Sequence, residues 1–216
     1  MTDDKNNPNA LNVDDGYSIF KYVLIGALVI ILGVVAYNVY QNNQEASFAE
    51  MGDNVYKFEE THFNPALEKK GDADFSTLIN EFGNLFSHPA SKQGALSVES
   101  IKVADFLIAN DKAEEAKNIL NRALKFADSD FARHFIISRL GVLEQNAGNV
   151  EGAISLYESL LKQKMTVMED KVYLQLGVLY AKKGNKEKAK ASLNYVVEKS
   201  KDETLLKIAR LYLGEM

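Results

Sequence analysis

The sequence predicts an all-α protein with one N-terminal transmembrane helix, an α-solenoid of about three degenerate helical hairpins and a C-terminal capping helix. Three observations carry this prediction. Residues 22–44 contain no charged side chain. In the C-terminal half, the sequence repeats itself at a spacing of 36 residues, which is typical of helical solenoids. Within the two clearest repeats, a Gly-Asn pair separates two stretches whose apolar residues recur at helical spacing.

Residues 22–40 are the apolar part of the charge-free run and the predicted membrane anchor. As a helix they extend about 28 Å at roughly 1.5 Å per residue, close to the ~30 Å hydrocarbon core of a bilayer. Tyr22 lies at one end and Tyr37 and Tyr40 lie at the other, where interfacial aromatic residues are found. The run is longer than the roughly 7–15 residues of a signal-peptide core, and no A-x-A-like cleavage site follows it. We therefore expect an uncleaved signal-anchor, with a buried helix of a soluble core as the alternative.

The basic residues near this run predict its orientation. Lys5 and Lys21 precede the run, and the first basic residue after it is Lys57. Basic residues close to a span set its orientation, whereas acidic residues contribute little. We expect the N-terminus in the cytoplasm and the C-terminal domain outside it, which in a bacterium means an inner-membrane protein with a periplasmic domain. The chain has no cysteine, so cysteine usage neither supports nor excludes an oxidising compartment.

The segments on either side of the anchor are polar. Residues 1–21 are rich in Asp, Asn and Lys and are predicted to form a disordered cytoplasmic tail. Residues 41–72 are predicted to form a juxtamembrane helix that continues the anchor, followed by a loop from residue 61 onward, where Pro65 and Gly71 occur. The solenoid domain is predicted for residues 73–216, beginning with a short amphipathic helix over residues 75–86.

The repeats themselves are read from matching residue pairs. Leu140-Gly-Val-Leu recurs as Leu176-Gly-Val-Leu, and Gly148-Asn recurs as Gly184-Asn. Glycine suits the left-handed position after a helix, and asparagine suits the N-cap of the next helix. A weaker copy precedes these two, and there Asp111-Lys-Ala-Glu has the spacing of a capping box. Each copy is therefore predicted to be a pair of helices joined by a short turn.

At these positions the chain resembles the tetratricopeptide repeat, or TPR, whose signature runs from a large residue through Leu-Gly and Tyr to Ala, an aromatic residue and Ala. The matching residues are Tyr173, Leu176, Gly177, Tyr180 and Ala189 in the last copy, Leu140, Gly141, Ala153 and Tyr157 in the middle copy, and Ala104 and Ala116 in the first. The repeats are longer than the usual 34 residues and lack the closing proline. Residues 204–213 are predicted to form a helix that covers the last hairpin, because a terminal repeat otherwise exposes apolar surface.

No constellation in the sequence suggests catalysis, so an enzyme is not expected. The three histidines are scattered, and no nucleotide-binding, metalloprotease or nucleophile-elbow motif occurs. We expect neither a metal nor a cofactor. The net charge is −5 and no basic stripe is present, which argues against a nucleic-acid partner. The partners expected are proteins, together with the lipid bilayer around residues 22–40.

In TPR arrays the first helix of each hairpin lines the concave side, where partners bind. Carried over by position, this resemblance implies a partner-binding groove made of Val98, Ile101, Asp105, Phe135, Ser138, Val142, Lys171, Leu174 and Val178. The set is largely apolar with a few polar members. It is better suited to an extended or amphipathic segment than to a strongly charged tail, although part of the set is equally consistent with core packing.

The order of these features also resembles the ancillary SecYEG translocon subunit family, bacterial inner-membrane proteins with a single span and a periplasmic TPR domain. The resemblance implies a non-enzymatic protein that associates with the Sec translocon and links it to periplasmic chaperones and exported clients. Two alternatives stay open. One is a TPR scaffold for another envelope-assembly or cell-division complex, and the other is a subunit that recruits substrates to an envelope protease or hydrolase. The oligomeric state is not predicted.

Overall fold

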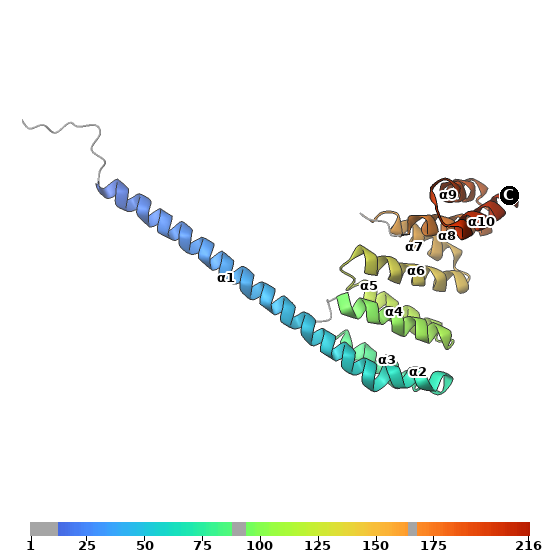
Figure 1. Cartoon of the computed structure of the whole chain (residues 1–216), viewed down its shortest axis with the longest axis horizontal. Helices are drawn as coiled ribbons and strands as arrows, with labels where there is room; N and C mark the ends of the chain where they lie inside the picture. The colour runs from blue at the N-terminus through green and yellow to red at the C-terminus, as the bar shows by residue number, and fades with distance from the viewer. Residues whose placement is uncertain (1–12, 88–93, 164–167) are drawn as a thin grey trace, which may run out of the picture. The chain divides into compact units, whose positions relative to one another are not determined.

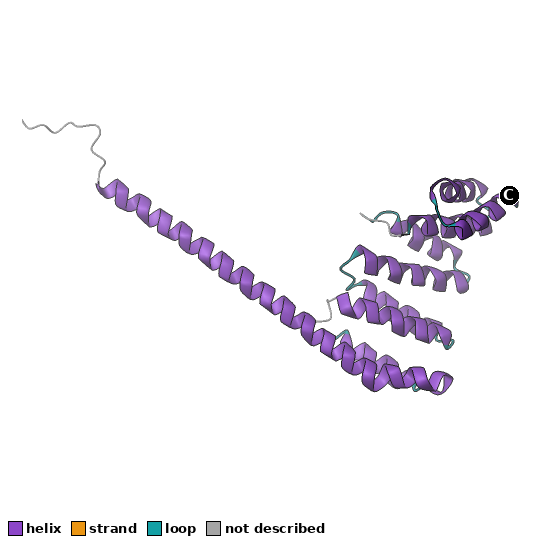
Figure 2. Ribbon diagram, viewed as in Figure 1, coloured by secondary structure: helices purple, strands orange, loops and turns teal. Residues whose placement is uncertain are grey.

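The computed structural model describes residues 13–87, 94–163 and 168–216, and within its first helix it describes no side chain before Ile30. All regular elements in these ranges are helical (Figures 1 and 2). The chain divides into two units, Met1–Ala46 and Ser47–Met216.

The N-terminal unit contains most of α1, which runs from Val13 to Phe58. Residues 1–12 of the predicted disordered tail lie outside the description, whereas residues 13–21 are helical, so the helix begins earlier than expected. Of the predicted anchor, residues 22–29 are helical but their side chains are not described. Residues 30–40 carry eight large apolar side chains that are each more than half exposed. Across the described residues, no helix combines the length and the apolar content that crossing a membrane requires.

The predicted loop after residue 61 is instead helical. A π-helix, η1, spans Glu59–Phe63 and is followed by α2 over Asn64–Lys69 and a 3-10 turn, η2, over Lys70–Asp72. Phe63 and Ala66 are buried in the main apolar core. This burial stabilises a helix here although the segment contains the turn-forming residues Pro65 and Gly71. Pro65 is the second residue of α2 and directly follows the wider π-helical turn of η1, in which Asn64 N–H donates to the Glu59 carbonyl.

The predicted short helix is confirmed as α3, Phe75–Leu85, with the Asp74 carboxylate as its N-cap, accepting from Thr77 N at 3.0 Å. Phenylalanine rings join α3 to the end of α1: the Phe82 ring lies 5.1 Å from that of Phe58 and 5.4 Å from that of Phe86. The last residues of α1, together with η1, α2 and α3, therefore form an additional helical layer before the repeats.

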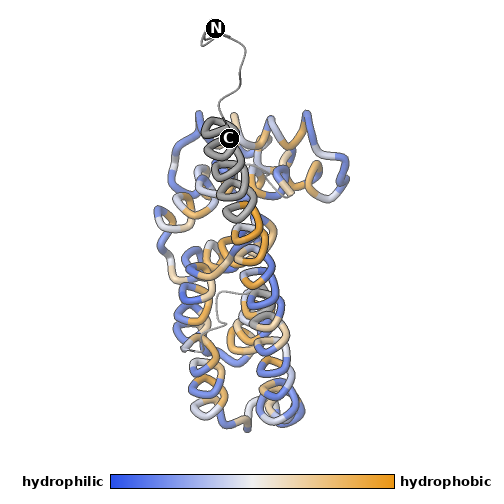
Figure 3. Tube along the Cα trace, turned by 90° about the vertical axis from the view of Figure 1, so that its left-hand side faces the viewer, coloured by the Kyte–Doolittle hydropathy of each residue, from blue (hydrophilic) through white to orange (hydrophobic). Residues whose placement is uncertain are grey.

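Three helical hairpins follow, as predicted. They are α4 (Gly94–Ala109) with α5 (Ala113–Leu124), α6 (Asp130–Asn146) with α7 (Val150–Leu160), and α8 (Glu169–Lys182) with α9 (Lys186–Lys199). The second helix of each hairpin also packs on the first helix of the next, which produces a stack of helix pairs. Figure 3 shows hydrophobic and hydrophilic residues alternating along the coils of these helices.

The turns inside the last two hairpins are as predicted. Gly148 and Gly184 have φ angles of 80° and 82°, in the left-handed region that glycine adopts at least cost. Asn149 and Asn185 cap α7 and α9 by accepting from Gly152 N and Lys188 N. The predicted capping box at Asp111 is wrong. Asp111 has a φ of 58° and holds the left-handed position that glycine holds in the other repeats, and Lys112 is the N-cap.

The small residues of the repeat signature lie where paired helices approach closely. A Cβ atom at Gly141 would lie 2.8 Å from the Tyr157 ring, and one at Gly177 would lie 2.6 Å from Leu193 Cγ. All four signature alanines, namely Ala104, Ala116, Ala153 and Ala189, are fully buried. The sequence signature therefore has a steric cause, since larger residues would separate the helices of each hairpin.

The predicted capping helix is also present, as α10 over Glu203–Gly214, with Asp202 as its N-cap. It packs on α8 and α9 and buries Leu205 and Ala209 against Leu193 and Val196. The last hairpin is thereby covered by apolar side chains on its outer side.

Candidate partner-binding groove

The first helices of the second and third hairpins, α6 and α8, enclose a hollow of about 220 Å³. It is lined by His134, Phe135, Ser138, Arg139, Val142, Tyr157, Met168, Lys171, Val172 and Gln175. Four residues of the predicted groove, namely Phe135, Ser138, Val142 and Lys171, therefore meet in one place. We call this the α6–α8 hollow.

The other residues of the predicted groove have different surroundings. Val98 and Asp105 are exposed on α4, and Ile101 is half-buried there. On α8, Val178 is half-buried, whereas Leu174 is only 5% exposed and packs in the same apolar cluster as Leu193 and Val196. Leu174 is a core residue rather than part of an open groove, because the capping helix covers that side of α8.

Apolar side chains are exposed in the lining of the α6–α8 hollow and directly beside it. Phe131, on the first turn of α6, is 57% exposed and lies 4.6 Å from the Phe135 ring, centroid to centroid. Val142 is 45% exposed and Met168, at the start of α8, is 42% exposed. Methionine and aromatic side chains are common at surfaces that bind apolar segments of partners, since they adapt to or fill irregular gaps.

A bidentate ion pair fixes one edge of the hollow. Arg139 Nε and one of its terminal nitrogens each donate to an Asp105 carboxylate oxygen at 2.8 Å, which joins α4 to α6. The guanidinium carbon also lies 5.8 Å from the Phe135 ring centroid. Asp105 was predicted to line the groove from its position in the repeat, whereas Arg139 was not. A pair this exposed contributes roughly 0–1 kcal/mol to stability, so its clearer effect is to orient Arg139.

The charges at the hollow favour an apolar ligand with an acidic group. His134 is buried, and burial lowers its pKa, so the imidazole is neutral at pH 7. Its Nδ1 atom has no hydrogen-bond partner among the described residues. The Lys171 side chain is exposed and forms no salt bridge within the described part of the chain. A carboxylate of a bound segment would therefore find the exposed Lys171 ammonium group beside the apolar lining.

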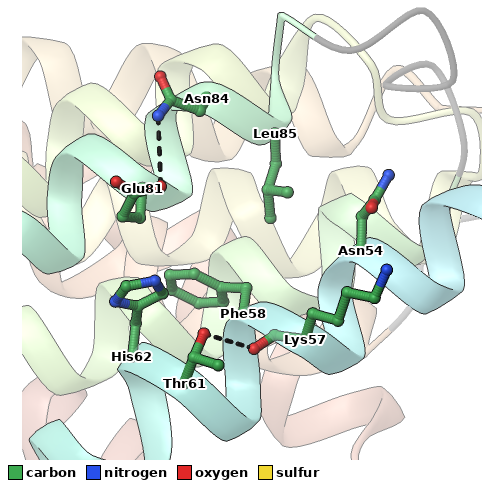
Figure 4. Close-up of a pocket in the computed structure, with 8 residues that line it drawn as sticks. All are labelled: Asn54, Lys57, Phe58, Thr61, His62, Glu81, Asn84 and Leu85. Atoms are coloured by element: carbon green, nitrogen blue, oxygen red, sulfur yellow. Dashed lines mark hydrogen bonds between the residues drawn. The ribbon is translucent and has the colours of Figure 1, made fainter.

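A second hollow, of about 280 Å³, lies near the start of the Ser47–Met216 unit (Figure 4). It is lined by Asn54, Lys57, Phe58, Thr61, His62, Glu81, Asn84 and Leu85. Some polar groups of this lining already hydrogen-bond to each other: Thr61 Oγ1 donates to the Lys57 carbonyl, and Asn84 Nδ2 donates to Glu81 Oε2. The lining mixes both charges with amides and offers no exposed apolar residue comparable with Val142.

Neither hollow has a set of residues suited to metal chemistry. Within the residues that the structure describes, no group of three or more His, Cys, Asp or Glu side chains is placed to hold a metal ion. The chemistry that the α6–α8 hollow supports is binding, through an apolar slot, the guanidinium that Asp105 holds and the exposed Lys171 ammonium.

The comparison with known families agrees with the geometry of the last hairpin. The family model described as tetratricopeptide repeat matches residues 170–198, which covers nearly all of α8 and α9. No curated protein matches the chain. The chain therefore contains a tetratricopeptide repeat, a unit typical of non-enzymatic protein–protein interaction scaffolds.

Proposed function

We propose that this protein is a membrane-anchored, non-enzymatic scaffold that binds protein partners on the side of the solenoid formed by α4, α6 and α8. The observation that carries the proposal is the α6–α8 hollow, where Val142 and Met168 are exposed in the lining and Phe131 is exposed beside the lining residue Phe135. Exposed apolar residues that border a hollow are typical of interaction sites, and this hollow lies on first helices of hairpins, which line the binding face of TPR arrays. The occupant we expect is an extended or amphipathic segment that carries a bulky apolar side chain and a nearby carboxylate.

The anchor in this proposal is the stretch of residues 22–40. Its support is the charge-free sequence, together with the exposure of the large apolar side chains from Ile30 to Tyr40 along one helix. Apolar side chains exposed on several turns of a helix need a cover, and a bilayer supplies one. Anchoring has a physical use here, because it holds a weak binding site at high effective concentration near its partner.

The proposed orientation places the repeats outside the cytoplasm, and a fusion of alkaline phosphatase to Met216 tests it. The enzyme is active only after export from the cytoplasm. In bacterial cells we expect an active fusion in the membrane fraction, since Lys5 and Lys21 precede the span and no basic residue follows it before Lys57. A stable fusion without activity would place the repeats in the cytoplasm and contradict the proposal.

The resemblance to the ancillary SecYEG translocon subunits supplies the specific partner in our proposal. We expect Sec subunits, and with them periplasmic chaperones or exported clients, to co-purify with the full chain from detergent-solubilised membranes. A different envelope-assembly or cell-division complex in the purified material would support the first alternative. A protease or cell-wall hydrolase would support the second. Either of those results, obtained without Sec subunits, contradicts the translocon assignment but leaves the scaffold role in place.

A further inference from the structure

A buried carboxyl group joins the additional N-terminal layer to the first hairpin. Glu99 lies on α4 and is only 2% exposed, and its Oε1 atom has no hydrogen-bond partner among the described residues. Its other oxygen, Oε2, contacts Lys102 Nζ at 2.9 Å. Buried glutamates are uncommon unless their charge is fully compensated, and here half of the carboxyl group is left unpaired.

The compensation is incomplete because Lys102 is shared. The same Nζ atom lies 2.5 Å from Oε1 of Glu59, the first residue of η1. One ammonium group therefore faces two carboxyl groups on two different elements. If both carboxyl groups are ionised, the cluster carries one uncompensated negative charge next to an apolar core. A proton on Glu99 removes that charge at little structural cost.

The cluster lies where η1 contacts α4, the first helix of the first hairpin. η1 follows directly on α1, and it meets α4 through this cluster and through an edge-to-face contact of Phe63 with Phe106, centroid to centroid 5.8 Å. η1 is also π-helical, a rare geometry that is often found at functional sites. The contact that responds to protons thus lies between the segment that follows α1 and the first repeat.

We propose that Glu59, Glu99 and Lys102 form a proton-sensitive latch that holds η1 against α4 when Glu99 is protonated and loosens when Glu99 is ionised. In the closed contact the Glu99 carboxylate is shielded from water, whereas in the open contact it is hydrated. Ionisation of Glu99 therefore favours the open contact. Glu59 and Lys102 are the titratable groups that act on Glu99 within the described part of the chain. The proposal is independent of the partner that binds the solenoid.

The titration of Glu99 sets the direction and the pH range. Burial, followed by the Glu59 carboxylate, raises the pKa of Glu99 to about 7, although Lys102 opposes the rise. An exposed glutamate has a pKa of 4.5, so the folded form binds more protons than the unfolded form between these values. The stabilisation of the closed contact by protonated Glu99 is therefore complete below pH 4.5 and is lost as the pH rises through 7. The ceiling of the effect is roughly 300-fold in the opening equilibrium, from the difference between the two pKa values.

The test is amide hydrogen exchange of the full chain in mild detergent, comparing the wild type with Glu99→Gln at pH 5 and pH 8. Glutamine mimics the protonated carboxyl group, so the variant should fold and keep the latch closed at both values. At pH 8 we expect the wild type to exchange at least 10-fold faster than the variant over residues 59–63 and 99–107, below the ceiling of roughly 300-fold. At pH 5 the two proteins should exchange equally, and α8 and α9 should not differ at either pH.

Burial lowers the pKa of His134, so His134 costs stability as the pH falls, opposite to Glu99. Comparison at equal pH removes this effect, which both proteins share, together with the intrinsic pH dependence of exchange. A second variant, Glu59→Gln, removes the like charge and should move the midpoint of the wild-type transition to lower pH, since the pKa of Glu99 falls. Equal protection of wild type and Glu99→Gln at pH 8 would overturn the proposal. A difference that is as large in α8 and α9 as in η1 would overturn it as well, because it would show global destabilisation rather than a latch.

Discussion

Removal of residues 203–216, which contain α10, is expected to lower the melting temperature of the repeat unit by on the order of 10 °C. The truncation deletes Leu205 and Ala209 and uncovers Leu193 and Val196, all members of one apolar cluster. Burial of a leucine or valine side chain contributes roughly 1.5–3 kcal/mol, so the loss of two such burials costs roughly 3–6 kcal/mol. For a unit of this size, each kcal/mol lowers the melting temperature by roughly 2–4 °C, which gives a decrease on the order of 10 °C. Thermal unfolding of the full chain and the truncated chain, followed by circular dichroism, measures it.

Two leucine substitutions in α10 test whether the helix stabilises the repeats by covering the apolar cluster or merely by being present. Leu205 is 9% exposed, and Leu205→Ala should lower the free energy of unfolding by roughly 2–3 kcal/mol. Leu211 lies on the same helix and is 61% exposed, and Leu211→Ala should change it by less than about 0.5 kcal/mol. An unchanged melting temperature after truncation, or equal effects of the two substitutions, would contradict the capping role.

Phe82→Ala is expected to lower the free energy of unfolding by roughly 3–5 kcal/mol, the usual cost of removing a fully buried phenylalanine. Phe82 has no exposed surface, and its ring packs between those of Phe58 and Phe86. The substitution leaves a cavity where α3 meets the end of α1. The size of the loss therefore reports whether this N-terminal layer unfolds together with the repeats. Urea unfolding followed by far-ultraviolet circular dichroism measures it.

The control is the same substitution at Phe131, whose ring is 57% exposed on α6. Phe131→Ala removes one aromatic contact with Phe135 and should cost at most about 1.5 kcal/mol. If Phe82→Ala costs no more than Phe131→Ala, the N-terminal layer contributes little to the stability of the repeats, contrary to the structure.

The hairpins were predictable from the sequence because their determinants are local. Gly148 with Asn149 sets the turn of the middle repeat, and the same pair recurs 36 residues later. The segment after residue 61 was not predictable in this way. Pro65 and Gly71 indicated a loop, but the burial of Phe63 against distant rings favours helix there, and burial of this kind is a tertiary effect that no short window of sequence contains.

The site was predictable only in outline. The repeat register placed Phe135, Ser138, Val142 and Lys171 on one side, and they line one hollow. Arg139 was missed although it lies four residues after Phe135 and three before Val142, a spacing that places all three on one face of α6. Its bond to Asp105, 34 positions away, was not predictable from the local sequence. Leu174 looked like a groove residue because the register does not reveal which side of α8 the capping helix covers.

The central claim, that the α6–α8 hollow binds the partner, is tested most directly by Val142→Glu. Val142 is 45% exposed at the hollow, so the substitution should place a carboxylate in the apolar slot without destabilising the fold. The control is Asn194→Glu, which adds a carboxylate to an exposed position on α9, the second helix of its hairpin. The measurement is the amount of partner that co-purifies with each full-length variant from solubilised membranes. We predict at least a 10-fold loss for Val142→Glu and no loss for Asn194→Glu. Equal recovery of partner with both variants would contradict the claim.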